Sequence, residues 1–431
     1  GSIGMTFSQL LDEKSFIRTV LVASASKVTW QDDTLSYLGD WKNKADYYLV
    51  NDEQYLNGRY ALSSFYSRKV NARLNYKTGF QLSNIFYNVI NDKWNNALQS
   101  YRTVQNGKGN VWLVQPYFQA RYRATEKLTL TGGLHAMWLT FNQTTSIEPR
   151  LSALYSFNGK QSLTAAYGLH SQIQPIGAYF TAVPAINDTY LYPNKNLKFT
   201  KSHHFVLGYN HLFEGNFRVK TEAYYQYMFN LPVSADANST YSPINDRDGY
   251  SQVALVNKGV GKNMGLDVTI EKFFSNKFFF LLGGAIYDSK YRPLDGKWYD
   301  TRYNGKYNTS LMAGKEFYFK KGGVLETGFR AVYSGGLRYT PGDLAASKAA
   351  GFFVPIDSLV NSKVLPNYFR TDVRVAYRWN GKKYASMVAL DIQNVTNRKN
   401  YATEVYNANL GKLQLRQQAT LTPVISWMID F

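Results

Sequence analysis

Residues 411–431 alternate between apolar and polar side chains almost without a break. The apolar-rich positions are Leu413, Leu415, Gln417, Ala419, Leu421, Pro423, Ile425, Trp427, Ile429 and Phe431. Because successive side chains of a strand point to opposite faces, this segment predicts one strand with an apolar and a polar face. Strands of soluble proteins usually have about 5 or 6 residues, so an alternation this long favours a membrane-spanning strand.

The same alternation recurs earlier in the chain, at 128–138, 217–227, 266–271 and 373–379. Charged residues at every second position are excluded from a core that packs on both sides, so one face of these strands is wet. The positions of Val268 and Val375 in this alternation predict that both side chains face lipid. Their neighbours Thr269 and Ala376 are predicted to face the other side.

Two kinds of connection separate the predicted strands. Tight turns with Asn, Gly and Ser chemistry are predicted at 71–73, 125–127, 158–160, 214–216, 275–277, 321–323 and 380–382. Long irregular segments are predicted at 92–109, 174–199, 231–249, 292–304, 339–364 and 396–410. They alternate with the turns, except near 142–146, where the connection is short. Turns at one end and long loops at the other are typical of outer-membrane barrels.

The predicted fold is therefore all-β, a transmembrane antiparallel up-and-down β-barrel with about sixteen strands present. The chain has 35 Tyr, 26 Phe and 8 Trp, which suit aromatic girdles at two membrane interfaces. It has no Cys and hence no disulfide. No apolar run approaches the roughly 18 residues of a membrane helix.

A net charge of +19 raises the question of nucleic-acid binding. The basic residues are spread along the whole chain, without a dense arm or a basic helix. Spread charge suits a polar lumen and a surface rich in lipopolysaccharide better, and no nucleic-acid partner is predicted.

Four short segments of the sequence resemble segments found in one protein family. They are Ser-Ile-Glu-Pro-Arg at 146–150, Tyr-Pro-Asn-Lys-Asn-Leu at 192–197, the glycine-rich 254–265 leading into Leu-Asp-Val, and Leu-Asp-Ile-Gln-Asn-Val-Thr-Asn at 390–397. In this order, and followed by a strand ending on Phe431, they resemble TonB-dependent outer-membrane receptors, particularly those of Bacteroidetes. The resemblance spans nearly the whole chain.

The resemblance implies a plug of roughly a hundred residues ahead of a barrel of about 22 strands. The chain begins at Gly1 without plug or signal peptide, and 7–30 already has the barrel pattern. Residues 1–431 are therefore expected to be a partial, C-terminal β-barrel, with the plug absent and about sixteen of 22 strands present.

As the resemblance implies, such a receptor lies in the bacterial outer membrane. It binds a scarce nutrient in extracellular loops, which could be a metal chelate, a cofactor, an oligosaccharide or a peptide. The TonB complex energises uptake through the missing N-terminal plug region. Further implied partners are outer-membrane lipid, lipopolysaccharide and a surface lipoprotein.

Aromatic residues in loops are the candidates for ligand contact, since flat faces stack on sugars or chelate rings. They are Tyr179, Phe180, Tyr190, Tyr192, Trp298, Tyr299 and Tyr303. The alternative is that they pack loops together or belong to the outer girdle. The resemblance also implies a barrel-assembly signal at Ile425, Trp427, Ile429 and Phe431.

No catalytic residue, metal site or bound cofactor is predicted. The five histidines lack metal-ligand spacing, and His203 and His204 are expected on opposite faces of a strand. Three other functions remain open. A passive porin predicts a loop that folds inward and a first strand that pairs with 411–431. An outer-membrane hydrolase predicts acidic or Ser/His groups at the rim, and the third alternative is a plugless adhesin or assembly scaffold.

Overall fold

The computed structural model describes residues 1–35, 47–95, 100–186, 189–246, 251–320, 322–381 and 383–430. One antiparallel sheet of 18 strands forms most of the molecule. Its strands are β1 (Ser2–Asp12), β2 (Ser15–Leu35), β3 (Tyr47–Lys69), β4 (Leu74–Asn95), β5 (Ser100–Arg123), β6 (Leu128–Leu139), β7 (Thr144–Ser156), β8 (Gln161–Gln172), β11 (Thr200–Phe213), β12 (Phe217–Ser234), β13 (Leu255–Ser275), β14 (Phe278–Arg292), β15 (Tyr299–Asp300), β16 (Tyr307–Tyr318), β17 (Val324–Ser334), β20 (Tyr368–Asn380), β21 (Ala385–Gln393) and β24 (Thr422–Asp430). Each long strand pairs with its neighbour in the chain, which gives an up-and-down order.

Small elements occupy the loops. They are η2 (Ile176–Phe180), β9 (Val183–Pro184), β10 (Tyr190–Leu191), η4 (Pro193–Asn196), η5 (Pro243–Asn245), β18 (Arg338–Tyr339), α1 (Leu344–Ala350), η6 (Asp357–Leu359), β19 (Lys363–Val364), β22 (Tyr401–Asn407) and β23 (Lys412–Gln417). The α1 helix begins where the Asp343 side chain accepts a hydrogen bond from the Ala346 amide, and it ends at Gly351 in the left-handed conformation. Within the described residues, no helix has the length and apolar character to cross a membrane.

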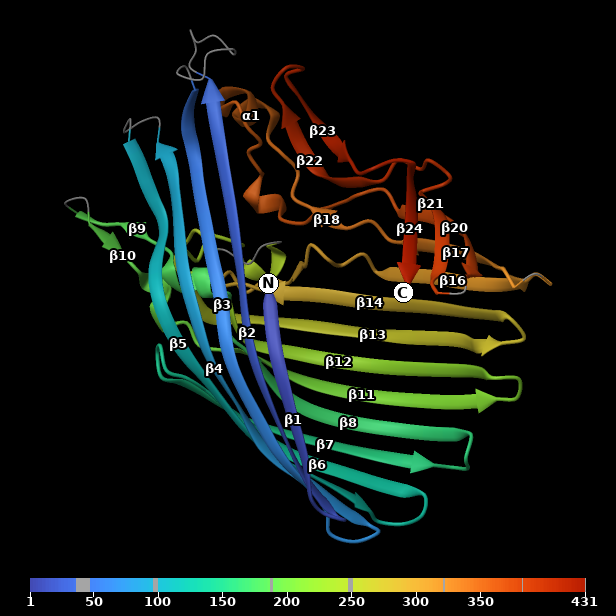
Figure 1. Ribbon diagram of the computed structural model, residues 1–431. Coiled ribbons are helices and arrows are strands. Elements are labelled where there is room, and N and C mark those ends of the chain that lie inside the picture. The colour runs from blue at the N-terminus through green and yellow to red at the C-terminus, as the bar shows by residue number, and fades with distance from the viewer. Residues whose placement is uncertain are drawn as a thin grey trace.

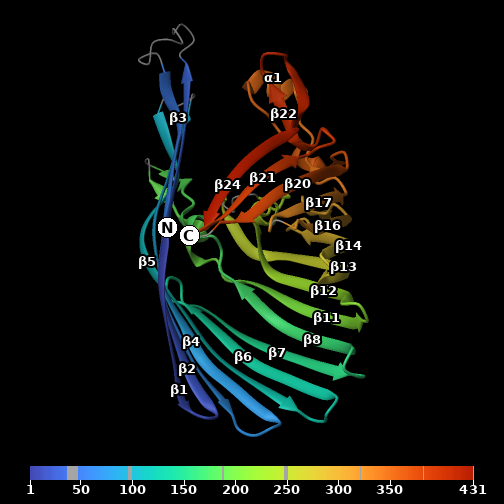
Figure 2. The ribbon, with the colours of Figure 1, turned by 45° about the vertical axis from the view of Figure 1, so that its right-hand side comes forward.

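The sheet curves into an open barrel, with short turns at one end and the long loops at the other (Figures 1 and 2). Its edges are β1 and β24. In the described part of the chain β1 pairs with β2 and β24 pairs with β21, and the two edges do not pair with each other. The predicted antiparallel up-and-down sheet is confirmed, and its strand number agrees with the sequence estimate. Among the residues that the structure describes, closure of the barrel is not observed.

Strand register separates two chemically different faces. On the concave face Arg150 lies opposite Gly133 and Gly168, and His204 lies opposite Gly168. On the convex face large apolar side chains are exposed, among them Leu134, Leu151, Phe205, Leu207, Ile286, Val375 and Trp427. A soluble protein would bury such a belt, whereas a membrane covers it with lipid. The parity predicted for Val268, Val375, Thr269 and Ala376 agrees with this register.

The prediction of one continuous strand over 411–431 is wrong. Residues 412–417 form β23, which pairs with β22 as a separate hairpin among the loops. The ladder to the barrel begins again at Thr422 and runs along β21. An alternating pattern shows only that a segment has one apolar and one polar face. A hairpin in a loop can have two such faces just as a barrel strand does, so the pattern does not distinguish them.

The prediction of an irregular loop over 92–109 is also wrong for most of these residues, which belong to β4 and β5. The β4–β5 ladder continues through Asp92 and Lys93 to the pair Asn95 and Ser100. β2 to β5 have 21 to 24 residues, whereas about 9 to 11 suffice to cross a bilayer. They therefore extend beyond the other strands on the loop side (Figure 1), where both faces can be polar. That polarity made the segment resemble a loop.

Candidate functional site

The concave face of β4 to β8 and β11 carries a cavity of about 550 Å³ whose lining mixes polar and apolar side chains. Its polar lining includes Gln81, Gln115, Gln119, His135, Arg150, His170 and His204. Amide, imidazole and guanidinium groups donate hydrogen bonds, and all but the guanidinium can accept them. This wall can therefore bind a polar occupant of the lumen.

Glu148 on β7 organises one side of this cavity, and its side chain is 1% exposed. Its Oε2 atom accepts hydrogen bonds from Nδ1 of His135 and from Nη2 of Arg150, each at 2.8 Å. Its Oε1 atom is buried and has no hydrogen-bond partner among the described residues. A buried carboxylate oxygen without a donor is costly, so this atom can accept a donor group that enters from the lumen.

Two further histidines line the same cavity. His170 and His204 have ring centroids 4.6 Å apart. His203 points to the convex face, where its Nδ1 lies 3.0 Å from the Tyr167 hydroxyl, so the expected opposite orientation of His203 and His204 is confirmed. The described residues contain no group of three or more His, Cys, Asp or Glu side chains suited to a metal ion.

The sequence alone does not show that these residues meet. Glu148 and Arg150 belong to the segment Ser-Ile-Glu-Pro-Arg, and the spacing of the histidines predicts no metal site. Strand parity places Glu148 and Arg150 on one face, but that His135 lies directly opposite Glu148 depends on the β6–β7 register. Register is fixed by turns and packing rather than by alternation.

The loop between β8 and β11 folds against the concave wall of the extended strands. Tyr179 and Phe180 in η2 are fully or almost fully buried there. The Phe180 ring lies 4.8 Å from that of Tyr87 on β4 and 5.5 Å from that of Phe141. Burial raises the pKa of Tyr179 above its ordinary value, so its hydroxyl stays neutral at physiological pH.

Gln105 on β5 ties this loop to the wall. Its Oε1 accepts hydrogen bonds from the Tyr55 hydroxyl at 2.9 Å and from Asn91 at 3.3 Å. Its Nε2 donates to the carbonyl of Gly177 at 3.0 Å and to that of Ser251 at 3.3 Å. These hydrogen bonds hold the loop in one position, because moving it would leave the buried Gln105 amide and its partners without hydrogen bonds.

The other predicted ligand residues lie apart from this core. The Tyr190 hydroxyl accepts a hydrogen bond from the Thr103 amide at 3.2 Å. Lys195 lies over the Tyr192 ring at 4.6 Å. The predicted set is thus distributed over two loop regions, of which Tyr179 and Phe180 are closed to a ligand while the β8–β11 loop keeps this conformation.

In the second region, between β14 and β16, Trp298 and Tyr303 are partly exposed. The Tyr299 hydroxyl donates to Asp295 at 2.5 Å, and this hydrogen bond is the main reason that the pKa of Tyr299 rises to about 12, with burial adding to it. The Tyr303 hydroxyl donates to the carbonyl of Asp246 at 3.2 Å.

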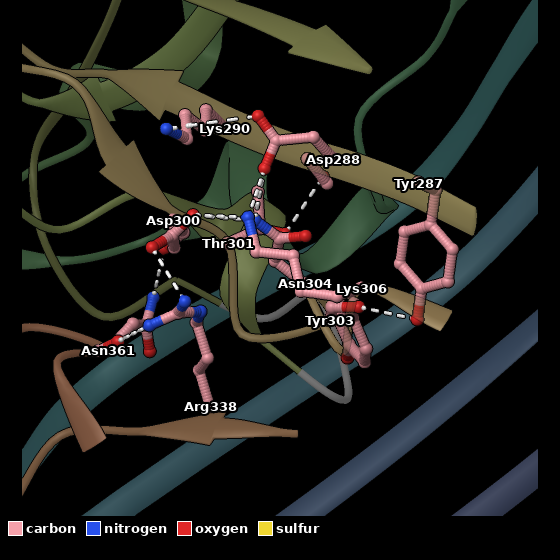
Figure 3. A network of polar contacts seen from close by, with 11 residues as sticks. Tyr287, Asp288, Lys290, Asp300, Thr301, Tyr303, Asn304, Lys306, Arg338 and Asn361 are labelled. Carbon is pink, nitrogen blue, oxygen red and sulfur yellow. Dashed lines mark hydrogen bonds and ion pairs between the residues drawn. The ribbon is translucent and has the colours of Figure 1, made fainter. Parts of the chain in front are cut away.

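A polar network fixes this second region (Figure 3). Asp288 on β14 pairs with Lys306 and accepts a hydrogen bond from Asn304 at 2.9 Å. Asp300 on β15 accepts from Asn304 at 2.5 Å and pairs with Arg338 at 3.1 Å. The two carboxylates therefore join β14, the 299–306 segment and β18 into one unit.

Comparison with known proteins decides the family. A family model described as TonB dependent receptor-like, beta-barrel, matches residues 13–395. The chain belongs to this TonB-dependent receptor family. Its members are receptors and transporters of the bacterial outer membrane rather than enzymes, and the predicted family and location are confirmed. The narrower resemblance to Bacteroidetes receptors stays a prediction.

Solved receptor structures share the fold. The ferric preacinetobactin receptor BauA of Acinetobacter baumannii is 12% identical with a TM-score of 0.65, and this chain covers 62% of it. The ferric-catecholate import receptor Fiu of E. coli K12 is 11% identical with a TM-score of 0.69, and this chain covers 63% of it. Each comparison covers 100% of this chain, which spans less than two thirds of those receptors. No curated protein sequence matches it.

The C-terminal strand of this receptor barrel presents its predicted assembly residues to the membrane. Ile425, Trp427 and Ile429 alternate along β24 and are exposed on the convex face. Phe431 lies outside the described residues. The role of these residues in barrel assembly stays a prediction.

We expect Glu148→Ala to lower the free energy of unfolding of the receptor barrel by about 1 to 3 kcal/mol, because the imidazole of His135 loses a charged acceptor at a buried position. Arg150→Ala should cost less, since the Arg150 side chain is 45% exposed and water replaces its partner. Urea unfolding of the two variants in lipid bilayers measures both. A larger loss for Arg150→Ala would contradict this assignment.

Proposed function

We propose that this chain is the C-terminal part of the barrel of an outer-membrane receptor for active nutrient uptake. The observation that carries the proposal is the family match over residues 13–395. It is supported by the unpaired edges β1 and β24 in the described chain and by the share of the solved receptors that the chain covers. The proposed complete receptor also has a plug and the remaining strands of a barrel of about 22.

In this proposal the loops bind the nutrient and the TonB complex, acting through the plug region, admits it. The polar concave wall around Glu148 would provide hydrogen bonds along the route. Among the predicted aromatic residues, Trp298 and Tyr303 are exposed as the receptor stands. Tyr179 and Phe180 would contact a ligand after the β8–β11 loop moves. A surface lipoprotein remains part of the proposal as a partner at the loops.

Solved relatives suggest which nutrients to test first. BauA is a ferric preacinetobactin receptor, Fiu a ferric-catecholate import receptor, and FecA, 11% identical to this chain, a ferric citrate transporter. We propose an iron chelate as the first candidate ligand, with cobalamin, an oligosaccharide and a peptide as the others.

Uptake by a deletion strain tests the function. Cells lacking the receptor gene should lose uptake of one labelled compound from a panel of ferric citrate, a ferric catecholate, cobalamin, a maltooligosaccharide and a short peptide. Restoring the gene should restore uptake, and a protonophore should abolish it because TonB draws on the proton gradient. Uptake that survives the protonophore would favour the passive porin.

The mass of the native protein tests the domain proposal separately. An antibody against 339–364 should detect an outer-membrane species well above the 49.2 kDa of this chain. A species of 49.2 kDa would contradict a missing plug and favour a self-contained barrel.

A further inference from the structure

The short turns at one end of the sheet (Figure 1) share a chemical feature. All but the turn between β11 and β12 carry an exposed lysine or arginine among the described residues. The acidic residues of these turns are Glu13, Glu126 and Glu214, so positive charge is in excess at this end. We call this set of turns the turn rim, and its exposed cations are Lys14, Arg73, Lys127, Lys160, Lys277, Lys320 and Lys383.

The backbone places the cation at the same position in four neighbouring turns, from β1–β2 to β7–β8. In each, the amide of the basic residue donates a hydrogen bond to a side-chain oxygen two residues earlier. The distances are 2.7 Å for Lys14, 2.8 Å for Arg73, 3.2 Å for Lys127 and 2.9 Å for Lys160. Neighbouring strands are about 4.8 Å apart and each turn joins two of them, so consecutive cations are spaced by roughly 10 Å.

Most of this charge is not neutralised within the chain. Lys160 pairs with Glu214 of the next turn at 3.3 Å. Within the part of the chain that the structure describes, Lys14, Arg73 and Lys127 form no ion pair with a carboxylate, and all three are exposed. These three consecutive cations can therefore bind an anion outside the chain.

Aromatic residues mark the depth at which the membrane ends beside the turn rim. Phe157 and Phe274 are 44% and 51% exposed, and each comes three residues before a turn cation, Lys160 or Lys277. Exposed aromatic residues of a barrel form the girdle at the membrane interface, and the short turns lie on the periplasmic side. The cations beyond the girdle therefore face the periplasm.

We propose that the turn rim binds the carboxylates of peptidoglycan, the anionic polymer that lies beneath the outer membrane. One exposed ion pair adds little affinity. A polymer that repeats its carboxylates meets several cations at once, and each contact after the first is intramolecular, which raises the affinity far above that for a small anion. The position beyond the aromatic girdle favours this polymer over a lipid headgroup.

The proposal rests on the location of the receptor in the outer membrane and concerns its periplasmic end, not its loops or lumen. Peptidoglycan binding and nutrient uptake are measured separately. A failure of either measurement therefore leaves the other proposal standing.

Co-sedimentation of the purified full-length receptor with purified peptidoglycan sacculi, in an uncharged detergent at low ionic strength, tests the proposal. The triple variant Lys14→Gln/Arg73→Gln/Lys127→Gln should bind about tenfold more weakly, the effect of losing three exposed ion pairs. The control Lys108→Gln/Lys348→Gln/Lys363→Gln removes the same charge from exposed positions at the loop end and should bind as the natural protein does.

Three further arms make the result specific. The charge-preserving variant Lys14→Arg/Arg73→Lys/Lys127→Arg should retain most of the binding, which shows that the triple Gln variant fails for lack of cations and not for lack of folding. Sacculi whose carboxylates have been converted to neutral amides should bind weakly. The receptor embedded in bilayers that contain phosphatidylglycerol should still bind sacculi, because the headgroups do not occupy the turn rim.

Three outcomes would overturn the proposal. The first is equal binding by the triple Gln variant and its control, and the second is equal binding of amidated and natural sacculi. The third is loss of sacculus binding in the phosphatidylglycerol bilayer, which would mean that the turn rim contacts lipid headgroups instead.

Discussion

Replacing Val268 by arginine should lower the free energy of unfolding of the barrel by about 2 to 4 kcal/mol. Val268 lies near the middle of β13 on the convex face, between Leu266 and Ile270, and opposite Thr221 and Gly284 in the ladders. An arginine there places a charge among acyl chains, and its side chain is too far from either interface to reach water without distortion.

Thr269→Arg is the matched control, one residue along the same strand. Thr269 lies on the concave face, opposite Lys220 and Gly283 and between the carboxylates Asp267 and Glu271. Water and these acids can accommodate a cation, so the control should cost well under half as much. Urea unfolding of both variants in lipid bilayers measures the difference. Equal losses would mean that the two faces have been assigned wrongly.

Truncating Phe180 to alanine should release the β8–β11 loop from the wall. Removing a buried phenylalanine costs about 3 to 5 kcal/mol, and here the loss falls on the loop because Phe180 joins η2 to β4 and β5. Limited proteolysis of the receptor in membranes should cut within 176–186 many times faster, while the barrel strands stay protected. Leu191→Ala in the same loop removes a side chain that is 62% exposed and should leave the rate unchanged.

Gly107 provides the complementary test from the other side of this contact. A Cβ atom on Gly107 would lie 2.2 Å from the Phe180 ring, so even Gly107→Ala pushes the ring away from β5. The expected result is the same faster proteolysis without any change in the loop sequence. If neither variant exposes the loop, the packing of η2 against the wall does not hold it in place.

Much of the fold follows from local chemistry. Alternation along 217–227 or 373–379 reports two unlike faces, and Asn, Gly and Ser between strands report turns, so strands, hairpins and face parity could be predicted. The sequence pattern gave wrong predictions where two different structures produce the same pattern of apolar and polar residues. The segment 412–417 alternates because it is a two-faced loop hairpin, and 92–109 is polar because its strands extend into water.

The candidate sites depended on contacts that no local pattern contains. Glu148 meets His135 across the β6–β7 register, and Phe180 meets Gly107 across the β8–β11 loop. The sequence by itself therefore determined which side chains face lipid and which face the lumen, because a strand's period of two is a property of its own backbone. Only the tertiary structure decided which of them meet, because register and loop packing are set by interactions between segments distant in the chain.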